Sequence, residues 1–280
     1  MGMGVGLVVS GFFYWLGILY KRHRLSWVTG GFLCLMFLKM SSKGDPQGLT
    51  LLGTGATAAL AWVIKKQQSL VGPVFDWTVL ITLLLLFGFD AIPGLRDATI
   101  DLRQSQLLIS PAKPILLLIL PWLVLTPVHP NPWVSINVPL PYLFALILFV
   151  TLGTLIPLAI VSGYARLGLS GAAAPVVAYQ LAYNLVFVCV IEESFFRGLI
   201  QTALICWLRR LYGSSGDRWA LLGVSLLFGG VHWGGGPAFV VLATLAGLGY
   251  GLVYYLTRRL EYAVFLHFTV NAVYQLFMNA

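Results

Sequence analysis

Two adjacent glutamates and an arginine follow one of the most apolar stretches of the sequence. Glu192 and Glu193 come directly after the apolar run 185–191, and Arg197 lies four residues beyond Glu193. An ionisable side chain at the centre of a membrane helix costs about 2.5–3.5 kcal/mol on insertion scales, so such groups usually face a bundle interior or a water-filled cavity. Residues four apart share a helix face, so Glu193 and Arg197 can pair, whereas Glu192 points about 100° away and lacks that partner. The pattern favours one paired carboxylate and one available for chemistry; a buried pair that only fixes helix packing is the alternative.

Two histidines lie inside later apolar runs and have partners at helical spacing. His232 follows Phe228 by four residues, and His267 precedes Asn271 by four, so imidazole and carboxamide share a face of the last helix. Each histidine alone is more often a packing residue. A carboxylate and an imidazole can hold a water and act as general base, while a second imidazole and an amide can donate to an oxyanion. The predicted chemistry is hydrolysis of an acyl bond without a covalent nucleophile.

The composition excludes a soluble globular protein. Of the 280 residues, 59% are hydrophobic and 9% are charged, whereas an average soluble domain is about 25% charged. The net charge of +8 would suit a nucleic-acid partner, but the 17 basic residues lie in short clusters between apolar runs and form no dense patch. The sequence therefore predicts an integral membrane protein with no nucleic-acid partner.

Long apolar runs predict the elements that position these residues. A helix needs about 20 apolar residues to cross the hydrocarbon core, and backbone groups in lipid must be satisfied internally, which favours helices over open strands. The strongest candidate spans are 75–93, 142–164, 176–208, 219–233 with 238–257, and 261–279, and the weaker ones are 5–20, 25–40, 49–64 and 114–128. The expected fold is an all-α, polytopic integral membrane helical bundle of about 8–10 transmembrane helices.

The chain divides into two regions by its loops and motifs. The stretch 95–113 is the most polar loop, and a proline-rich connection begins at His129. We expect an accessory N-terminal transmembrane region at 1–140 and a core that holds the chemistry at 141–280. The three cysteines, at 34, 189 and 206, have no paired spacing, so they indicate neither a disulfide nor a metal site.

The three motifs together resemble a known family. Glu192-Glu193-x-x-x-Arg197, Phe228-x-x-x-His232 and His267-x-x-x-Asn271 are similar, in this order, to the signatures of the CAAX-protease and bacteriocin-processing (CPBP, Abi) family of intramembrane glutamate proteases. The resemblance covers roughly residues 142–280 and has no counterpart in the N-terminal half.

The resemblance implies a role for each residue. Glu192 and His232 would activate the water, and His267 and Asn271 would form the oxyanion hole. Glu193, Arg197 and Phe228 would support the site. The resemblance implies an intramembrane endopeptidase of the CAAX prenyl protease type that requires no metal or other cofactor. Its substrate would be a membrane protein or peptide, prenylated or unmodified, held in the lipid bilayer. We expect a multi-pass protein of the cell (inner) membrane, with other membranes left open.

Four other interpretations stay open at the level of sequence. Some family members serve in immunity or as scaffolds, so a non-catalytic membrane protein is one alternative, and a proton-relay transporter is another. Gly168-Leu169-Ser170-Gly171 fits a rhomboid-like serine protease with His232 as its base, although a motif without its structural context is weak. Glu192, His232 and His267 also form a ligand set typical of catalytic zinc.

Overall fold

The computed structural model describes residues 9–10, 12–15, 98–102, 105–109 and 138–279. The chain forms two compact units, one of Met1–Thr126 with Val186–Ile191 and one of Pro127–Leu185 with Glu192–Ala280. Every residue of the candidate site belongs to the second unit. The regional boundary expected at residue 140 stays a prediction.

The first unit contains a β-hairpin in the stretch expected to be a polar loop. Strands β1 (Ala98–Leu102) and β2 (Ser105–Ile109) pair antiparallel, with Ala98 opposite Ile109. Two short runs separated by two residues are the sequence pattern of a hairpin. The runs 98–102 and 105–109 have this pattern, so the stretch 95–113 is not a loop throughout. Residues 9–10 and 12–15 are helical, within the weak candidate span 5–20. The candidate spans 25–40, 49–64, 75–93 and 114–128 lie outside the described residues.

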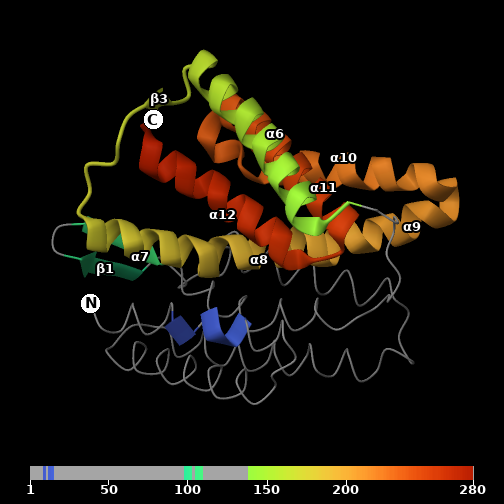
Figure 1. The fold of residues 1–280 in the computed structure, drawn as a ribbon, viewed down its shortest axis with the longest axis horizontal. Coiled ribbons are helices and arrows are strands. Elements are labelled where there is room, and N and C mark those ends of the chain that lie inside the picture. The colour runs from blue at the N-terminus through green and yellow to red at the C-terminus, as the bar shows by residue number, and fades with distance from the viewer. Residues whose placement is uncertain (1–8, 11, 16–97, 103–104, 110–137, 280) are drawn as a thin grey trace. The chain divides into compact units, whose positions relative to one another are not determined.

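The described segment 138–279 is a series of helices (Figure 1), and all of it except the stretch Val186–Ile191 belongs to the second unit. Its helices are α6 (Leu140–Val161), α7 (Ala174–Asn184), α8 (Val190–Glu193), α9 (Thr202–Tyr212), α10 (Gly216–Val231), α11 (Gly236–Thr257) and α12 (Leu260–Phe277). The π-helical turns are η1 (Leu185–Cys189) and η2 (Ser194–Gln201), and short 3-10 turns occupy Gly213–Ser215 and Trp233–Gly235. Strand β3 (Arg166–Leu167) pairs antiparallel with β4 (Met278–Asn279), next to the end of α12.

Three helical segments in the described part of the chain are long and apolar enough to cross a membrane. They are Leu140–Val161, Ala174–Val231 and Trp233–Thr257. The all-α membrane bundle predicted from the sequence is confirmed, while the expected number of spans extends into residues that are not described. The run 261–279 does form a helix, α12, but it is not among the three segments. Its polar residues, which include His267, Asn271 and Gln275, make it less apolar than the others.

The 58-residue segment Ala174–Val231 folds back on itself at Gly213–Ser215, so that α9 and α10 lie side by side (Figure 1). Gly213 has φ +60 and Gly216 touches the facing backbone: a Cβ at Gly216 would lie 2.5 Å from the carbonyl carbon of Leu208. Glycine is the residue that tolerates both the left-handed backbone and so close an approach.

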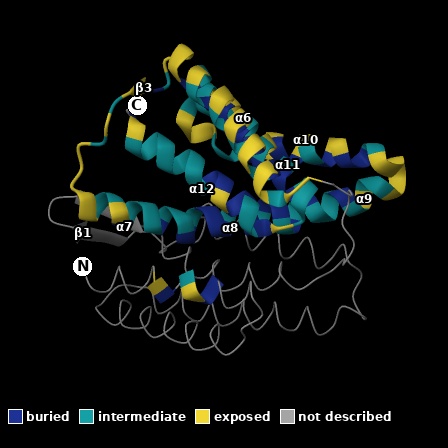
Figure 2. Cartoon of the chain, viewed as in Figure 1, coloured by how far each residue is buried: buried dark blue, intermediate teal, exposed yellow. Residues whose placement is uncertain are grey.

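Exposed positions lie along the outer faces of the helices in residues 138–279 (Figure 2), and many of them carry large apolar side chains. On α6, for example, Phe149 is 76% exposed and Val161 is 84% exposed. Exposed apolar surface of this extent marks an interaction with protein or membrane, and lipid would cover it here. Small residues face inward on α11: a Cβ at Gly247 would lie 3.1 Å from the ring of Phe228. Small residues of this kind let membrane helices approach closely.

Candidate active site

The ion pair predicted from the four-residue spacing is formed. Arg197 Nε donates to Glu193 Oε2 at 2.9 Å, and both side chains are fully buried. The guanidinium also lies over the rings of Phe228, at 5.3 Å, and Phe196, at 5.9 Å. A buried ion pair is tolerated only when good geometry and further partners offset the loss of hydration. Glu193 meets this condition because its second oxygen is bonded as well.

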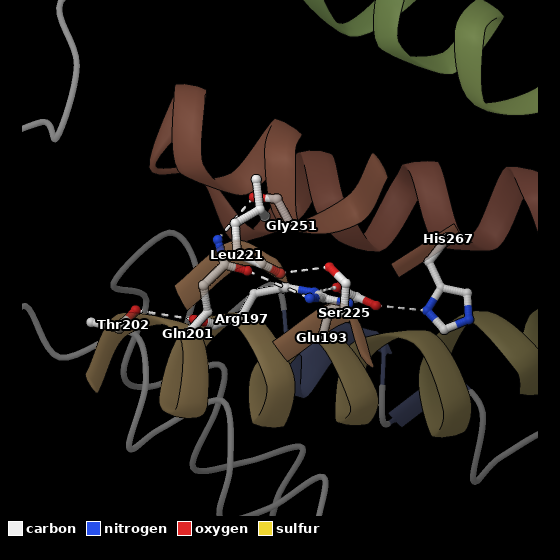
Figure 3. Close-up of polar contacts among 8 residues, drawn as sticks. All are labelled: Glu193, Arg197, Gln201, Thr202, Leu221, Ser225, Gly251 and His267. Carbon is white, nitrogen blue, oxygen red and sulfur yellow. Dashed lines mark hydrogen bonds and ion pairs between the residues drawn. The ribbon is translucent and has the colours of Figure 1, made fainter. Parts of the chain in front are cut away.

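His267 occupies the second oxygen of Glu193. Its Nδ1 lies 2.8 Å from Glu193 Oε1, so one carboxylate joins Arg197 on one side and His267 on the other (Figure 3). The imidazole is stacked on the ring of Tyr250, with centroids 4.6 Å apart and an interplanar angle of 14°. The bond to Glu193 fixes which nitrogen of His267 faces the remaining space, because Nδ1 must donate and Nε2 is left for other partners.

Phe228 is the residue that brings the three motifs together. Its ring contacts Arg197, and its centroid lies 4.8 Å from that of His232 and 5.7 Å from that of His267. The side chain is almost fully buried. A phenylalanine four residues before His232 therefore has a packing role that the motif alone does not reveal.

His232 caps the end of α10 and is half-buried. Its Nδ1 lies 2.7 Å from the carbonyl oxygen of Phe228, one turn earlier. A carbonyl can only accept, so Nδ1 carries the hydrogen and the neutral ring leaves Nε2 as an acceptor. The ring edge also packs on Phe239 at 5.4 Å. The contact with Phe228 thus selects the tautomer of a neutral His232 in which Nε2 is the acceptor.

Glu192 differs from its neighbour in having no polar partner in the described part of the chain. Its Oε2 is buried and unbonded, although the residue as a whole is half-buried. The structure does not join Glu192 directly to His232 by a hydrogen bond within residues 138–279. The sequence prediction that Glu192 would lack the Arg197 partner is confirmed.

Asn271 contacts α7. Its Nδ2 donates to Oδ1 of Asn184 at 3.2 Å. Asn184 lies nine residues before Glu193, which in an uninterrupted α-helix would place the two about half a turn apart. The π-helical turn η1 between them takes up an extra residue. Both residues consequently face α12, where His267 and Asn271 are their partners.

Gln201 is the member of the network that the sequence prediction missed. Its Nε2 donates to the carbonyl oxygen of Gly251 at 2.9 Å, and its Oε1 accepts from Arg197 Nη1 at 3.5 Å. It is fully buried, and the helix that carries it is close to α11, since a Cβ at Gly251 would lie 2.9 Å from Gln201 Oε1. The sequence contains one signal for it, because Glu193, Arg197 and Gln201 follow one another at steps of four residues, the spacing of one helix face.

The rhomboid-like and zinc interpretations gain no geometric support. Ser170 accepts a hydrogen bond from Ala172 N at 3.4 Å within its own loop, and residues 138–279 show no bond between Ser170 and His232. Glu192, His232 and His267 are all described, and no group of three His, Cys, Asp or Glu residues in the described part of the chain is arranged to hold a metal ion.

The helices that could cross a membrane and the buried carboxylate–imidazole network place the candidate site in an integral membrane protein. Residues 174–273 match the family model described as Rce1-like, Type II CAAX prenyl endopeptidase. The matched range starts at α7, ends in α12 and contains all three motifs, so the resemblance indicated by the sequence is confirmed over this range. The match supports a peptidase of the CAAX-protease type in a membrane. No curated protein and no solved structure matches the chain.

Proposed function

We propose that the protein is an intramembrane endopeptidase that hydrolyses a peptide bond with a water activated by Glu192 and His232. The observation that supports it best is the contrast within the motif Glu192-Glu193: Glu193 is bonded on both oxygens, while the buried Oε2 of Glu192 has no described partner. A carboxylate held without a protein partner beside a fixed network is what water activation requires.

In the first step of the proposed reaction, His232 and Glu192 act on the attacking water. Nε2 of His232 is the acceptor left by the bond to Phe228, so it can take a proton from a water that Glu192 orients. The water oxygen attacks the peptide carbonyl carbon and forms a tetrahedral intermediate. The same proton then passes to the leaving amine as the carbon–nitrogen bond breaks.

The oxyanion of that intermediate needs hydrogen-bond donors. Nδ1 of His267 is engaged by Glu193, so Nε2 presents an N–H only when the ring is doubly protonated. Glu193 stabilises this imidazolium through the contact. The carboxamide of Asn271 has the second donor, on the same helix face one turn away. The proposed oxyanion hole therefore combines the imidazole of His267 with the carboxamide of Asn271.

The proposed substrates are membrane proteins or membrane peptides, prenylated or unmodified. The experiment purifies wild type, Glu192→Ala and His232→Ala in detergent and assays a panel of prenylated and unmodified peptides. We expect cleavage by wild type alone. Equal cleavage by wild type and both variants would refute the mechanism, and no cleavage of any peptide by wild type would favour a scaffold or transporter.

Two controls separate the remaining alternatives. Glu261→Gln alters the third glutamate of the chain, which forms an ion pair with Arg259 at the start of α12, and it should retain activity. Ser170→Ala should also retain activity, whereas a rhomboid-like enzyme would lose it. Activity that survives a strong chelator excludes the zinc enzyme.

A further inference from the structure

A row of side-chain amides continues from the candidate site along α7 and α12. Asn271 donates to Asn184 at 3.2 Å, and one turn further Gln275 Nε2 donates to Gln180 Oε1 at 2.7 Å. The two helices run antiparallel, so steps of four residues match on both. His267, Asn271 and Gln275 therefore lie on one face of α12 and lead away from Glu193.

The outer pair, Gln180 with Gln275, retains unused hydrogen-bonding groups. A carboxamide has two donor hydrogens and a carbonyl acceptor. The single bond between the two leaves the Gln180 NH₂ without an acceptor and the Gln275 carbonyl without a donor among the described residues. Both side chains are half-buried. A donor and an acceptor thus stand side by side, which is the complement of the N–H and C=O of one residue in an extended chain, because these two groups point to the same side.

We propose that Gln180 and Gln275 form a subsite that binds the backbone of an extended substrate peptide. Four residues of α-helix span about 6 Å, and two residues of extended peptide span about 6.6–6.8 Å. A peptide running along α12 with its scissile carbonyl at Asn271 therefore brings the residue two positions away to this pair, with its N–H and C=O on the same side. The Gln275 carbonyl accepts its N–H, and the Gln180 NH₂ donates to its C=O. The inference rests on the proposed function.

Neighbouring contacts favour a subsite over a packing contact. Amide pairs between membrane helices often serve packing, but such a pair is worth most when its groups are satisfied, since an unpaired buried polar group is costly. Beyond the pair, the carbonyls of Leu276 and Phe277 already accept from Ser170 N and Gly168 N, each at 3.0 Å. The last carbonyls of α12 are therefore bonded by its own chain, whereas the Gln180 NH₂ and the Gln275 carbonyl have no bond to another described residue.

The subsite is tested by methylating the backbone nitrogens of the substrate one at a time. The probe is the fluorescein-labelled panel peptide that binds Glu192→Gln most tightly, with binding measured by anisotropy in detergent and KM measured on wild type. Methylation two residues from the scissile bond, on one side of it, should weaken binding about tenfold by removing one hydrogen bond. If methylation has no effect at any position on either side of the scissile bond, the subsite is refuted. This experiment changes the peptide, so it requires no protein variant that could misfold.

Paired variants sharpen the result. The double variant Gln180→Met with Gln275→Met removes both amides together, so neither amide is left without its partner. KM should rise about tenfold with kcat nearly unchanged, and binding should no longer depend on methylation of the peptide. Thr269→Val, which removes a hydroxyl bonded to the Phe265 carbonyl of the same helix, should leave KM unaltered. If binding is sensitive to methylation and no peptide is cleaved, the subsite is supported and the proposed hydrolysis is refuted. If peptides are cleaved and methylation has no effect at any position, the hydrolysis is supported and the subsite is refuted. A peptide panel that neither binds nor is cleaved overturns both.

Discussion

Glu192 and Glu193 are neighbours in the sequence and opposites in the structure. Glu193 is fully buried and holds Arg197 and His267, one on each oxygen. Glu192 is half-buried, and its buried Oε2 has no hydrogen bond with any described residue. The carboxylates are chemically identical, so position on the helix separates Glu193, which holds two partners, from Glu192, which has no described partner and which we propose acts on the water. Variants of the two sides should therefore fail in different ways.

The largest effect on activity is expected at Glu192. Glu192→Gln keeps the size of the side chain and removes its basicity, so kcat should fall by about 10²–10⁴-fold, the range of general acid–base catalysis. Stability should hardly change, because no described partner is lost. Peptide cleavage and SDS-induced unfolding in mixed micelles measure the two quantities. A loss of stability that accounts for the loss of activity would place Glu192 with the buried network instead.

Variants of the buried pair, Glu193 and Arg197, should lower the stability of the protein. Arg197→Leu leaves the carboxylate of Glu193 without its guanidinium, and breaking one partner of a buried pair costs about 3–5 kcal/mol. The SDS unfolding midpoint should fall accordingly. Replacing both charges, in Glu193→Gln with Arg197→Leu, should recover part of the loss, because no uncompensated charge remains. A double variant as unstable as the sum of its single variants would contradict the pairing.

This contrast shows how far the sequence alone could be used. Spacing within one helix predicted the Glu193–Arg197 pair and the isolation of Glu192, and apolar runs predicted α6 to α12, because 3.6-residue periodicity and span length are local properties. The bond between Glu193 and His267 joins residues 74 apart and depends on how helices pack. The extra residue in η1 changes which residues face α12, and an α-helical projection cannot anticipate it.

A smaller effect is expected at Gln201, where the buried network meets α11. Gln201→Leu removes the donor to the Gly251 carbonyl and the acceptor for Arg197 Nη1. A buried carbonyl left without its donor costs about 1–3 kcal/mol, so unfolding should shift less than for Arg197→Leu. Gln201→Glu keeps an acceptor for Arg197 and loses the donor, which separates the two contributions. A Gln201→Leu protein as stable as wild type would exclude Gln201 from the network.

The smallest effect is expected at the third glutamate. Glu261 pairs with Arg259, whose side chain is 48% exposed, in the first turn of α12. A surface ion pair contributes about 0–1 kcal/mol because water and salt screen it, and a carboxylate near a helix N-terminus adds about 0.3–1 kcal/mol. Glu261→Gln should therefore shift unfolding by at most about 1–2 kcal/mol, with kcat and KM unchanged. Since the same substitution at Glu192 should lower kcat by about 10²–10⁴-fold and Glu193 belongs to the buried pair, the three glutamates form a graded series. If Glu261→Gln lowered activity as much as Glu192→Gln does, the loss would reflect a general effect of carboxylate removal. The proposed distinction between Glu192 and the buried pair would then be wrong.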